Sequence, residues 1–288
     1  MSMAKNRFAI LLLGLALALQ GGGTSAPMPG QEGEPILLRF AGSTSMLPLV
    51  RELCAEYGAQ HPLVPCDLVG VGTDSGLELL RRGRVDLAMV SRELETDEVT
   101  DVRTANRLLN FYPIAEDAVA VIVNQSNPVR ELDLFNLRRL YQGRISDWGD
   151  LGANAGEILP VSREDGSATR QVFEELVMSG YSVSSGAVVM PGSQAVVDYV
   201  TQHADAVGYV SLGYVASDVA AIRLEGVEPN RASLLNGGYA IHRPLALVSL
   251  PATTAEVAAF VAFARGPRGQ AISSRLYGDV PAQTQGQP

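Results

Sequence analysis

The sequence has few of the residues on which thiol and metal chemistry depend. Among its 288 residues are two cysteines, Cys54 and Cys66, and three scattered histidines, His61, His203 and His242. The sequence shows no ligand spacing typical of a zinc site. It also shows no cysteine and histidine placed as a catalytic pair. These counts argue against a thiol protease or a zinc enzyme. We therefore expect no catalytic residues, no metal ion and no other cofactor.

Positive charge is also scarce. The chain has 22 Lys and Arg against 31 Asp and Glu, which gives a net charge of −9. Because an acidic chain repels nucleic acid and anionic membrane surfaces, we expect neither as a partner. An anion site in this chain must be built locally, against the field of the whole molecule.

The apolar run "FAILLLGLALAL" at residues 8–19 has 12 residues, too few to cross a bilayer comfortably. Lys5 and Arg7 precede it and small residues follow, an order typical of a secretory signal. We interpret 1–26 as a signal peptide and the Gly- and Pro-rich 27–35 as a flexible lead-in. A membrane anchor or a buried core helix is the alternative. A lipid anchor is not indicated, because there is no cysteine near residue 20. We therefore expect a periplasmic or secreted protein.

An even pair of cysteines in an exported chain indicates one disulfide. Cys54 falls in the first predicted helix and Cys66 at the start of the next predicted strand. The alternative is two buried free thiols.

Apolar periodicity predicts strands and helices in alternation after residue 35. A strand at 117–124 is apolar throughout its middle, which is typical of a parallel sheet covered on both faces. The alternation predicts an α/β fold. The expected strands begin near residues 36, 66, 85, 117, 158, 206 and 239, and the expected helices are 46–58, 77–83, 134–143, 169–180, 193–203 and 254–266.

Three turns, "AGSTSM", "GVGTDSGL" and "SREDGSATR", bring hydroxyls to the start of a predicted helix. A helix start exposes unpaired N–H groups and a partial positive charge, and small residues let an anion approach them. A tetrahedral oxyanion is the guest that suits such a turn. The residues concerned are Ser43, Thr44, Ser45, Thr73, Asp74, Ser75, Ser167 and Thr169.

Taken alone, each of the first two turns is better explained by ordinary helix capping, because Ser, Thr and Asp are common caps at helix starts. The third turn carries more information, because Arg163 precedes Ser167 by four residues. A guanidinium makes a forked, charge-assisted contact with an oxyanion that a cap does not need. The alternative is a surface arginine paired with Glu164 or Asp165.

Together these motifs resemble the phosphate-binding proteins of bacterial phosphate-specific ABC transporters, over about residues 37–281. The matching segments keep their order and include "GSTSMLPL", "GVGTDSGLELLRRGRVDLAMVSREL", "LRRLYQGRISDWGDLG" and "VSREDGSATRQVFEE". The resemblance implies a type II periplasmic-binding-protein fold with a ligand cleft between two lobes. The first lobe would hold 36–115 and 240–284, and the second 116–239. The hinges would lie near Pro113–Asp117 and Gly238–Arg243.

The resemblance also implies a function and a site. The protein would capture inorganic phosphate by lobe closure and deliver it to an ABC permease of the inner membrane, and we expect a monomer. In place of the family's usual glycine, Ala168 keeps the backbone N–H. The implied ligand-binding residues are Ser43, Thr44, Ser45, Thr73, Asp74, Ser75, Ser91, Arg92, Arg163, Gly166, Ser167, Ala168 and Thr169.

Ser91 stands where some members of the family carry an aspartate. That carboxylate accepts the proton of hydrogen phosphate, which sulfate lacks. Asp74 is our first candidate for a substitute and Asp117 the second, and many relatives carry the same "SR" turn. A receptor for sulfate or molybdate is therefore an alternative.

Two further readings belong to other classes. A secreted phosphate-ester enzyme needs a nucleophile with a base, or a metal set, and no such spacing is visible. A sensory or interaction protein that kept the fold is the other.

Overall fold

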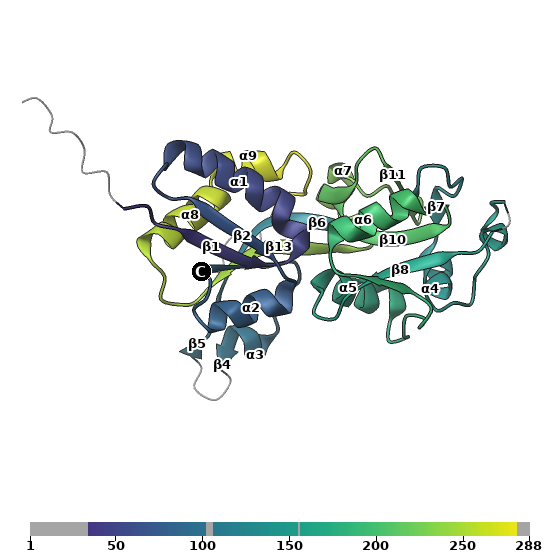
Figure 1. Ribbon diagram of the computed structural model, residues 1–288, viewed down its shortest axis with the longest axis horizontal. Helices are drawn as coiled ribbons and strands as arrows, with labels where there is room; N and C mark the ends of the chain where they lie inside the picture. Colours follow the sequence, from purple (N-terminus) through teal and green to yellow (C-terminus); the bar gives the residue numbers. More distant parts are fainter. Residues whose placement is uncertain (1–33, 102–105, 155, 281–288) are drawn as a thin grey trace, which may run out of the picture. The chain divides into compact units, whose positions relative to one another are not determined.

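The computed structural model describes residues 34–101, 106–154 and 156–280 (Figure 1). All elements named below belong to one compact unit, Pro35–Pro288. The predicted signal peptide, most of the lead-in and residues 281–284 of the last predicted segment lie outside the described residues. Within the described ranges, no helix has both the length and the hydrophobicity needed to cross a membrane.

The central sheet has the strand order β2-β1-β3-β13-β6-β10-β8-β9, with β11 beside β6. Its strands are β1 (Leu38–Gly42), β2 (Cys66–Gly70), β3 (Leu87–Val90), β6 (Asn110–Asn124), β8 (Leu159–Arg163), β9 (Val188–Met190), β10 (Ala206–Ser211), β11 (Val219–Ala221) and β13 (His242–Ser249). Two small pairs join β4 (Thr100–Asp101) to β5 (Asn106–Arg107) and β7 (Glu131–Leu132) to β12 (Arg223–Leu224). We call the part around β2, β1, β3 and β13 the first lobe, and the part around β10, β8 and β9 the second lobe.

Strand β6 belongs to both lobes. It begins at Asn110, before the expected start at 117, and pairs antiparallel with β13, β10 and β11. The expected parallel environment for this strand is therefore wrong, because an apolar run shows that both faces are covered and says nothing of strand direction. Residues 110–118 pair with β13 and 119–123 pair with β10. The lobe limits at 115 and 239 stay predictions.

Helices cover the sheet in both lobes (Figure 1). The first lobe carries α1 (Leu47–Gln60), α2 (Thr73–Arg81), α3 (Thr96–Val99), α8 (Ala255–Arg265) and α9 (Pro267–Ser273), and the second α4 (Leu134–Tyr141), α5 (Ala168–Phe173), α6 (Ser193–Gln202) and α7 (Arg231–Leu235). Short turns of helix are η1 (Thr44–Met46), η2 (Trp148–Leu151), η3 (Glu174–Met178) and η4 (Leu212–Tyr214). Helix α2 begins four residues before the expected Leu77. Helix α9 was not expected, although Pro267 at its first position is a common helix start.

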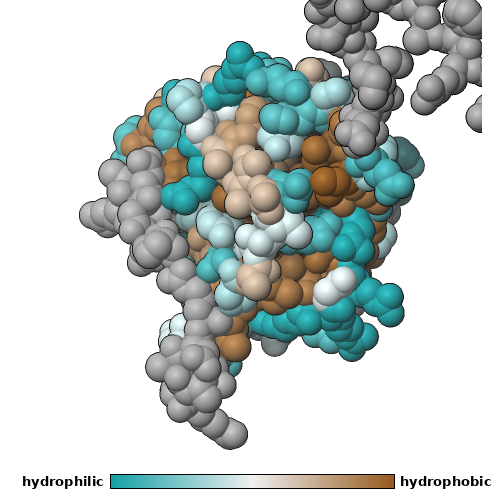
Figure 2. All heavy atoms as spheres, turned by 90° about the vertical axis from the view of Figure 1, so that its left-hand side faces the viewer, coloured by the Kyte–Doolittle hydropathy of each residue, from teal (hydrophilic) through white to brown (hydrophobic). Residues whose placement is uncertain are grey.

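Each lobe has its own apolar core. In the first lobe Phe40 of β1 packs edge-on against Phe260 of α8, with ring centres 5.0 Å apart. In the second lobe Phe173 stacks on Tyr209 of β10 at 4.0 Å. On the face shown in Figure 2, hydrophobic side chains lie in small groups between hydrophilic ones. The two cores share no residue among those described, so each lobe is stabilised by its own packing.

Cys54 on α1 and Cys66 on β2 form the expected disulfide, with Cα atoms 6.1 Å apart. Both residues are partly buried beside the core of the first lobe. The bond ties α1 to the edge strand of the sheet.

We expect Cys54→Ala/Cys66→Ala to lower the free energy of unfolding by about 3 kcal/mol, because closing a short loop restricts the unfolded chain. Urea unfolding followed by circular dichroism measures the loss. A reductant should lower the midpoint of the parent protein and leave that of the double variant unchanged. Equal midpoints for the oxidised parent and the variant would contradict the prediction.

Candidate functional site

The first lobe brings hydroxyls to the carboxyl ends of three neighbouring parallel strands. Ser43 follows β1, Thr73 follows β2, and Ser91 follows β3. These ends meet at one edge of the sheet, where α/β proteins bind ligands. The hydroxyl oxygens of Ser43 and Ser91 are 2.7 Å apart, and the backbone N–H of Ser91 donates to Thr73 Oγ1 at 3.5 Å. All three residues are buried.

Glycines make this convergence possible. A Cβ on Gly76, in the first turn of α2, would lie 2.5 Å from the Cα of Gly42. Gly42 itself has a φ of +142° and would place a Cβ against the carbonyl of Met89. A side chain at Gly76 would push α2 away from β1, and one at Gly42 would push β1 away from β3. The turn that carries Thr73 is thus held close to the turn that carries Ser43.

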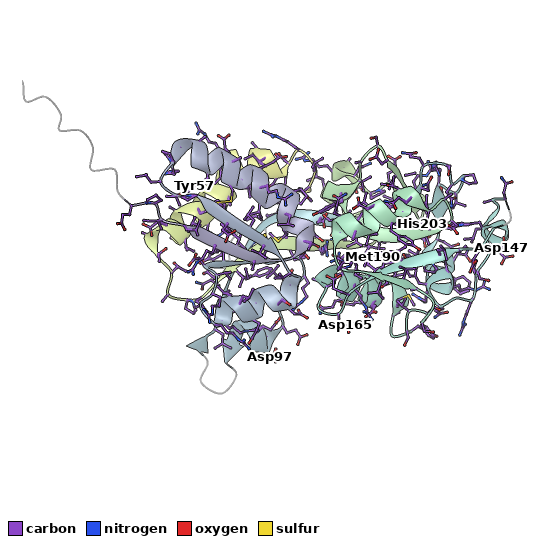
Figure 3. All side chains as sticks on the ribbon, in the orientation of Figure 1. Tyr57, Asp97, Asp147, Asp165, Met190 and His203 are labelled. Carbon is purple, nitrogen blue, oxygen red and sulfur yellow. A yellow bond between two sulfur atoms is a disulfide. The ribbon has the colours of Figure 1, made fainter. Side chains whose placement is uncertain are left out.

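The second lobe supplies a guanidinium and two more hydroxyls. Arg163 is the last residue of β8, and Ser167 caps α5 by accepting from the N–H of Arg170 at 3.4 Å. Gly166, with a φ of +79°, makes the turn between them. Thr169 lies in the first turn of α5, and Ser193 begins α6 after β9. Asp165 and Met190, labelled in Figure 3, mark these two turns.

Hydroxyls of the two lobes contact one another directly. Ser45 Oγ lies 2.9 Å from Thr169 Oγ1, and Thr44 Oγ1 lies 3.2 Å from Ser193 Oγ. We define the hydroxyl cluster as Ser43, Thr44, Ser45, Thr73, Ser91, Thr169 and Ser193. Apart from the partly buried Thr44, all its members are buried. The structure therefore brings together residues from the three turns that the sequence singled out.

Arg163 adds a positive charge to the cluster. Its Nη1 donates to Ser193 Oγ and its Nη2 to Thr44 Oγ1, both at 3.2 Å. Its Nε and Nη2 each donate to one carboxylate oxygen of Glu164 at 2.8 Å. The side chain is only 2% exposed. A forked contact with Glu164 fixes the plane of the guanidinium, so its remaining donors keep their direction.

A second buried guanidinium, which the sequence did not reveal as a site residue, borders the cluster. Arg243 of β13 pairs across the strands with Asp117 of β6 through Nε and Nη2, at 3.1 and 3.0 Å. Its Nη1 donates to Thr169 Oγ1 at 2.8 Å. Burial raises the pKa of Asp117 and lowers the pKa of Arg243, whereas their mutual attraction opposes both shifts.

Asp74, Ser75 and Arg92 lie beside the hydroxyl cluster and make no hydrogen bond with it among the described contacts. Arg92 donates to Asp74 at 3.0 Å and to Glu98 at 2.7 Å. The second oxygen of Asp74 accepts from Gln171 of the second lobe at 3.1 Å. Ser75 is exposed. Asp74 thus connects the lobes, with both carboxylate oxygens already accepting hydrogen bonds.

A cleft of about 800 Å³ opens next to the cluster. Both lobes line it, and Arg243 forms part of its wall while contacting Thr169. Its other charged lining residues are Asp74, Arg81, Arg92, Glu93, Glu95, Glu98, Glu175 and His242. The cleft thus reaches the hydroxyl cluster through the shared residue Arg243.

Four residues in or beside the site were not predicted from the sequence: Ser193, Gln171, Tyr214 and Arg243. Tyr214 of η4 donates its hydroxyl proton to the carbonyl of Thr44 at 2.7 Å, across the lobes. "PGSQ" carries a glycine and a serine ahead of a helix, as the other turns do, and this signal could have found Ser193. Arg243 has no local signal, because its partner lies 126 residues away.

The chain is similar to known proteins over most of its length. The family model of the PBP superfamily domain matches residues 29–267. The phosphate-binding protein PstS of Bacillus subtilis is 26% identical over 250 residues, which is 83% of this chain and 82% of that protein. A phosphate ABC transporter substrate-binding protein from Clostridium perfringens, solved with bound phosphate, superposes with a TM-score of 0.79 at 30% identity, covering 85% of this chain and 100% of that one. A phosphate transport receptor from Vibrio cholerae gives 0.66 at 30% identity, with 83% and 99% covered. The two-lobe type II fold expected from the sequence is confirmed.

A histidine and a carboxylate, His242 of β13 and Glu116 of β6, form a second ionisable pair on the strands that join the lobes. Nδ1 of His242 is 2.6 Å from Oε1 of Glu116. This hydrogen bond, against the opposing effect of burial, raises the pKa of His242 above its ordinary 6.5. The stabilisation by the protonated pair is therefore complete below the pKa of the unfolded chain and is lost as the pH rises through the folded pKa.

We expect His242→Gln to lower the urea midpoint more at about pH 5 than at about pH 8. His203→Gln is the matched control, since Nδ1 of His203 contacts the carbonyl of Tyr199 in place of a carboxylate. Equal losses for His242→Gln at both pH values would contradict the prediction.

Proposed function

Because this chain belongs to the PBP superfamily domain family, we propose that it is an extracytoplasmic solute-binding protein that captures inorganic phosphate for an ABC importer. One observation carries the proposal. The guanidinium of Arg163 and hydroxyls of both lobes converge in a buried cluster that can donate to one small tetrahedral anion. The names of the relatives and the bound phosphate in the Clostridium perfringens protein support the choice of ligand.

Capture would follow from contacts to both lobes at once. Thr44 and Ser45 belong to the first lobe, and Arg163 and Thr169 to the second. An anion between them stabilises the closed arrangement over any open one. Hydrogen bonds to a charged group contribute about 1.5–3 kcal/mol each, offset in part by desolvation and ordering. Several such bonds suffice for micromolar or tighter binding.

The burial of the cluster favours a small inorganic anion over a phosphate ester. Ser45 is 0% and Thr169 1% exposed, so an organic group attached to the anion would have to displace packed side chains. The cluster also has no feature of a nucleophile with its base, because the described hydroxyls bond to one another, to guanidinium groups or to the backbone. We therefore infer binding without catalysis.

The remaining assignments belong to the same proposal. The predicted signal peptide would export the protein, and an inner-membrane permease would receive the phosphate from its closed form. The proposed ligand-binding set is the hydroxyl cluster with Arg163, Ser167 and the backbone of Gly166 and Ala168. A monomer suffices, because both lobes that face the anion belong to one chain. Another oxyanion stays the alternative ligand.

We expect Arg163→Ala to weaken phosphate binding by much more than tenfold, on the order of a hundredfold, because it removes the charge that the hydroxyls surround. Calorimetric titration of ligand-stripped protein with phosphate measures the change. Arg170→Ala is the matched control, since Arg170 belongs to the same turn but pairs with Asp165 and Glu174. Unchanged phosphate affinity in folded Arg163→Ala would remove the central contact of the proposal.

A second prediction tests the closed form. Tyr214→Phe removes the hydrogen bond from the second lobe to the carbonyl of Thr44 without removing any group of the hydroxyl cluster. We expect a loss in phosphate affinity of about threefold to tenfold, the worth of one hydrogen bond. Tyr181→Phe, on an exposed tyrosine, serves as the control. Identical affinities for both variants would show that this bond does not contribute to closure.

A further inference from the structure

A guanidinium stands at each end of the hydroxyl cluster, and this determines which way the hydroxyl protons point. A guanidinium carries five N–H donors and no acceptor. A hydroxyl that accepts from it must direct its own proton elsewhere. The two arginines, Arg163 and Arg243, therefore set the donor and acceptor roles of their neighbours.

At one end Arg243 acts on Thr169. Its Nη1 donates to Thr169 Oγ1 at 2.8 Å, so the proton of Thr169 must point away from Arg243, and Ser45, 2.9 Å away, or a guest can accept it. Arg243 cannot rotate out of this role, because Nε and Nη2 both bind one oxygen of Asp117. The other oxygen of Asp117 accepts from Ser211 and from the N–H of Leu212.

At the other end Arg163 acts on two hydroxyls. Nη1 donates to Ser193 and Nη2 to Thr44, whose oxygen also accepts from the N–H of Ser193 at 3.3 Å. The oxygens of both hydroxyls are thus engaged as acceptors. Their protons point to a neighbouring hydroxyl of the cluster or to a guest.

The neighbouring carboxylates are hydrogen-bonded outside the hydroxyl cluster, and none of their described bonds goes to one of its members. Both oxygens of Glu164 accept from Arg163, both of Asp117 are engaged, and those of Asp74 accept from Arg92 and Gln171. Within the described part of the cluster, the pair Ser43 and Ser91 is left, and either oxygen of that pair can act as donor or acceptor.

We propose that Arg243 is a positioning residue that directs the proton of Thr169 away from itself. Together with Arg163, it makes the hydroxyl cluster bind an oxyanion mainly through the oxygens of the anion that carry no proton. The inference rests on the proposed function and deepens it. The hydroxyl cluster offers donors from Thr44, Thr169 and Ser193 and one neutral hydroxyl pair, Ser43 and Ser91. Sulfate, which has no proton, and hydrogen phosphate, which has one, both satisfy such a site, because a hydroxyl pair accepts or donates as needed.

The first test needs no variant. Calorimetric titration of the ligand-stripped parent protein near neutral pH should give a sulfate affinity within about tenfold of the phosphate affinity, because neither guest leaves a buried group unpaired. Sulfate weaker than phosphate by more than about a thousandfold would overturn this inference and leave the proposed function intact. Binding of neither anion would overturn both.

The second test assigns the effect to Arg243. In Asp117→Asn/Arg243→Gln a neutral amide pair replaces the ion pair, and the glutamine oxygen can accept the Thr169 proton, which frees the threonine oxygen as an acceptor. We expect this variant to favour phosphate over sulfate by about tenfold more than the parent does. Arg243→Lys, whose ammonium also only donates, should weaken both anions and keep their ratio.

A control and a readout of folding complete the design. Asp74→Asn should keep the ratio of the parent, because the oxygens of Asp74 are occupied outside the cluster. Thermal unfolding shows which variants are folded. An unchanged ratio in the folded double variant, or a shifted ratio in Arg243→Lys or Asp74→Asn, would overturn the assignment to Arg243. Should the double variant not fold, the sulfate-to-phosphate ratio of the parent still decides the selectivity of the site, and the ratio in Arg243→Lys still tests the assignment to Arg243.

Discussion

The burial of the Arg163 guanidinium is the constraint on which the arrangement of the site depends. A charge that is only 2% exposed is costly unless every donor finds an acceptor. Glu164 supplies two acceptors from the same turn, but Thr44 and Ser193 must come from other segments, and Thr44 from the other lobe. The turn after β1 and the start of α6 are therefore held against the end of β8.

The strands that join the lobes serve the same site. Asp117 of β6 and Arg243 of β13 are register partners, so the buried ion pair spans the two strands at the point where β6 passes from one lobe to the other. Through Thr169 the pair also contacts the first turn of α5. A movement of the lobes about these strands would change the position of Thr169 and of Arg243 together.

The site uses neutral donors to hold an anion in an acidic chain. With a net charge of −9, the molecule as a whole repels anions, and its cleft is lined by several carboxylates. Hydroxyls at the ends of parallel strands provide directed donors without further charge, and two guanidinium groups, each paired with a carboxylate, supply the local field. Selection among anions then depends on hydrogen-bond directions, which short, buried side chains fix well.

The sequence alone predicts the α/β class and the three turns with Ser43, Thr73 and Arg163, because capping hydroxyls, glycines and apolar periodicity act over a few residues. Its even pair of cysteines favoured the disulfide that the structure contains. The family resemblance added the two lobes. Only the tertiary structure decided the antiparallel pairing of β6, the pairing of Asp117 with Arg243 across 126 positions, and the separation of Asp74 and Arg92 from the hydroxyl cluster. Those features depend on strand register and on which lobe faces each side chain, and no local pattern of residues encodes either.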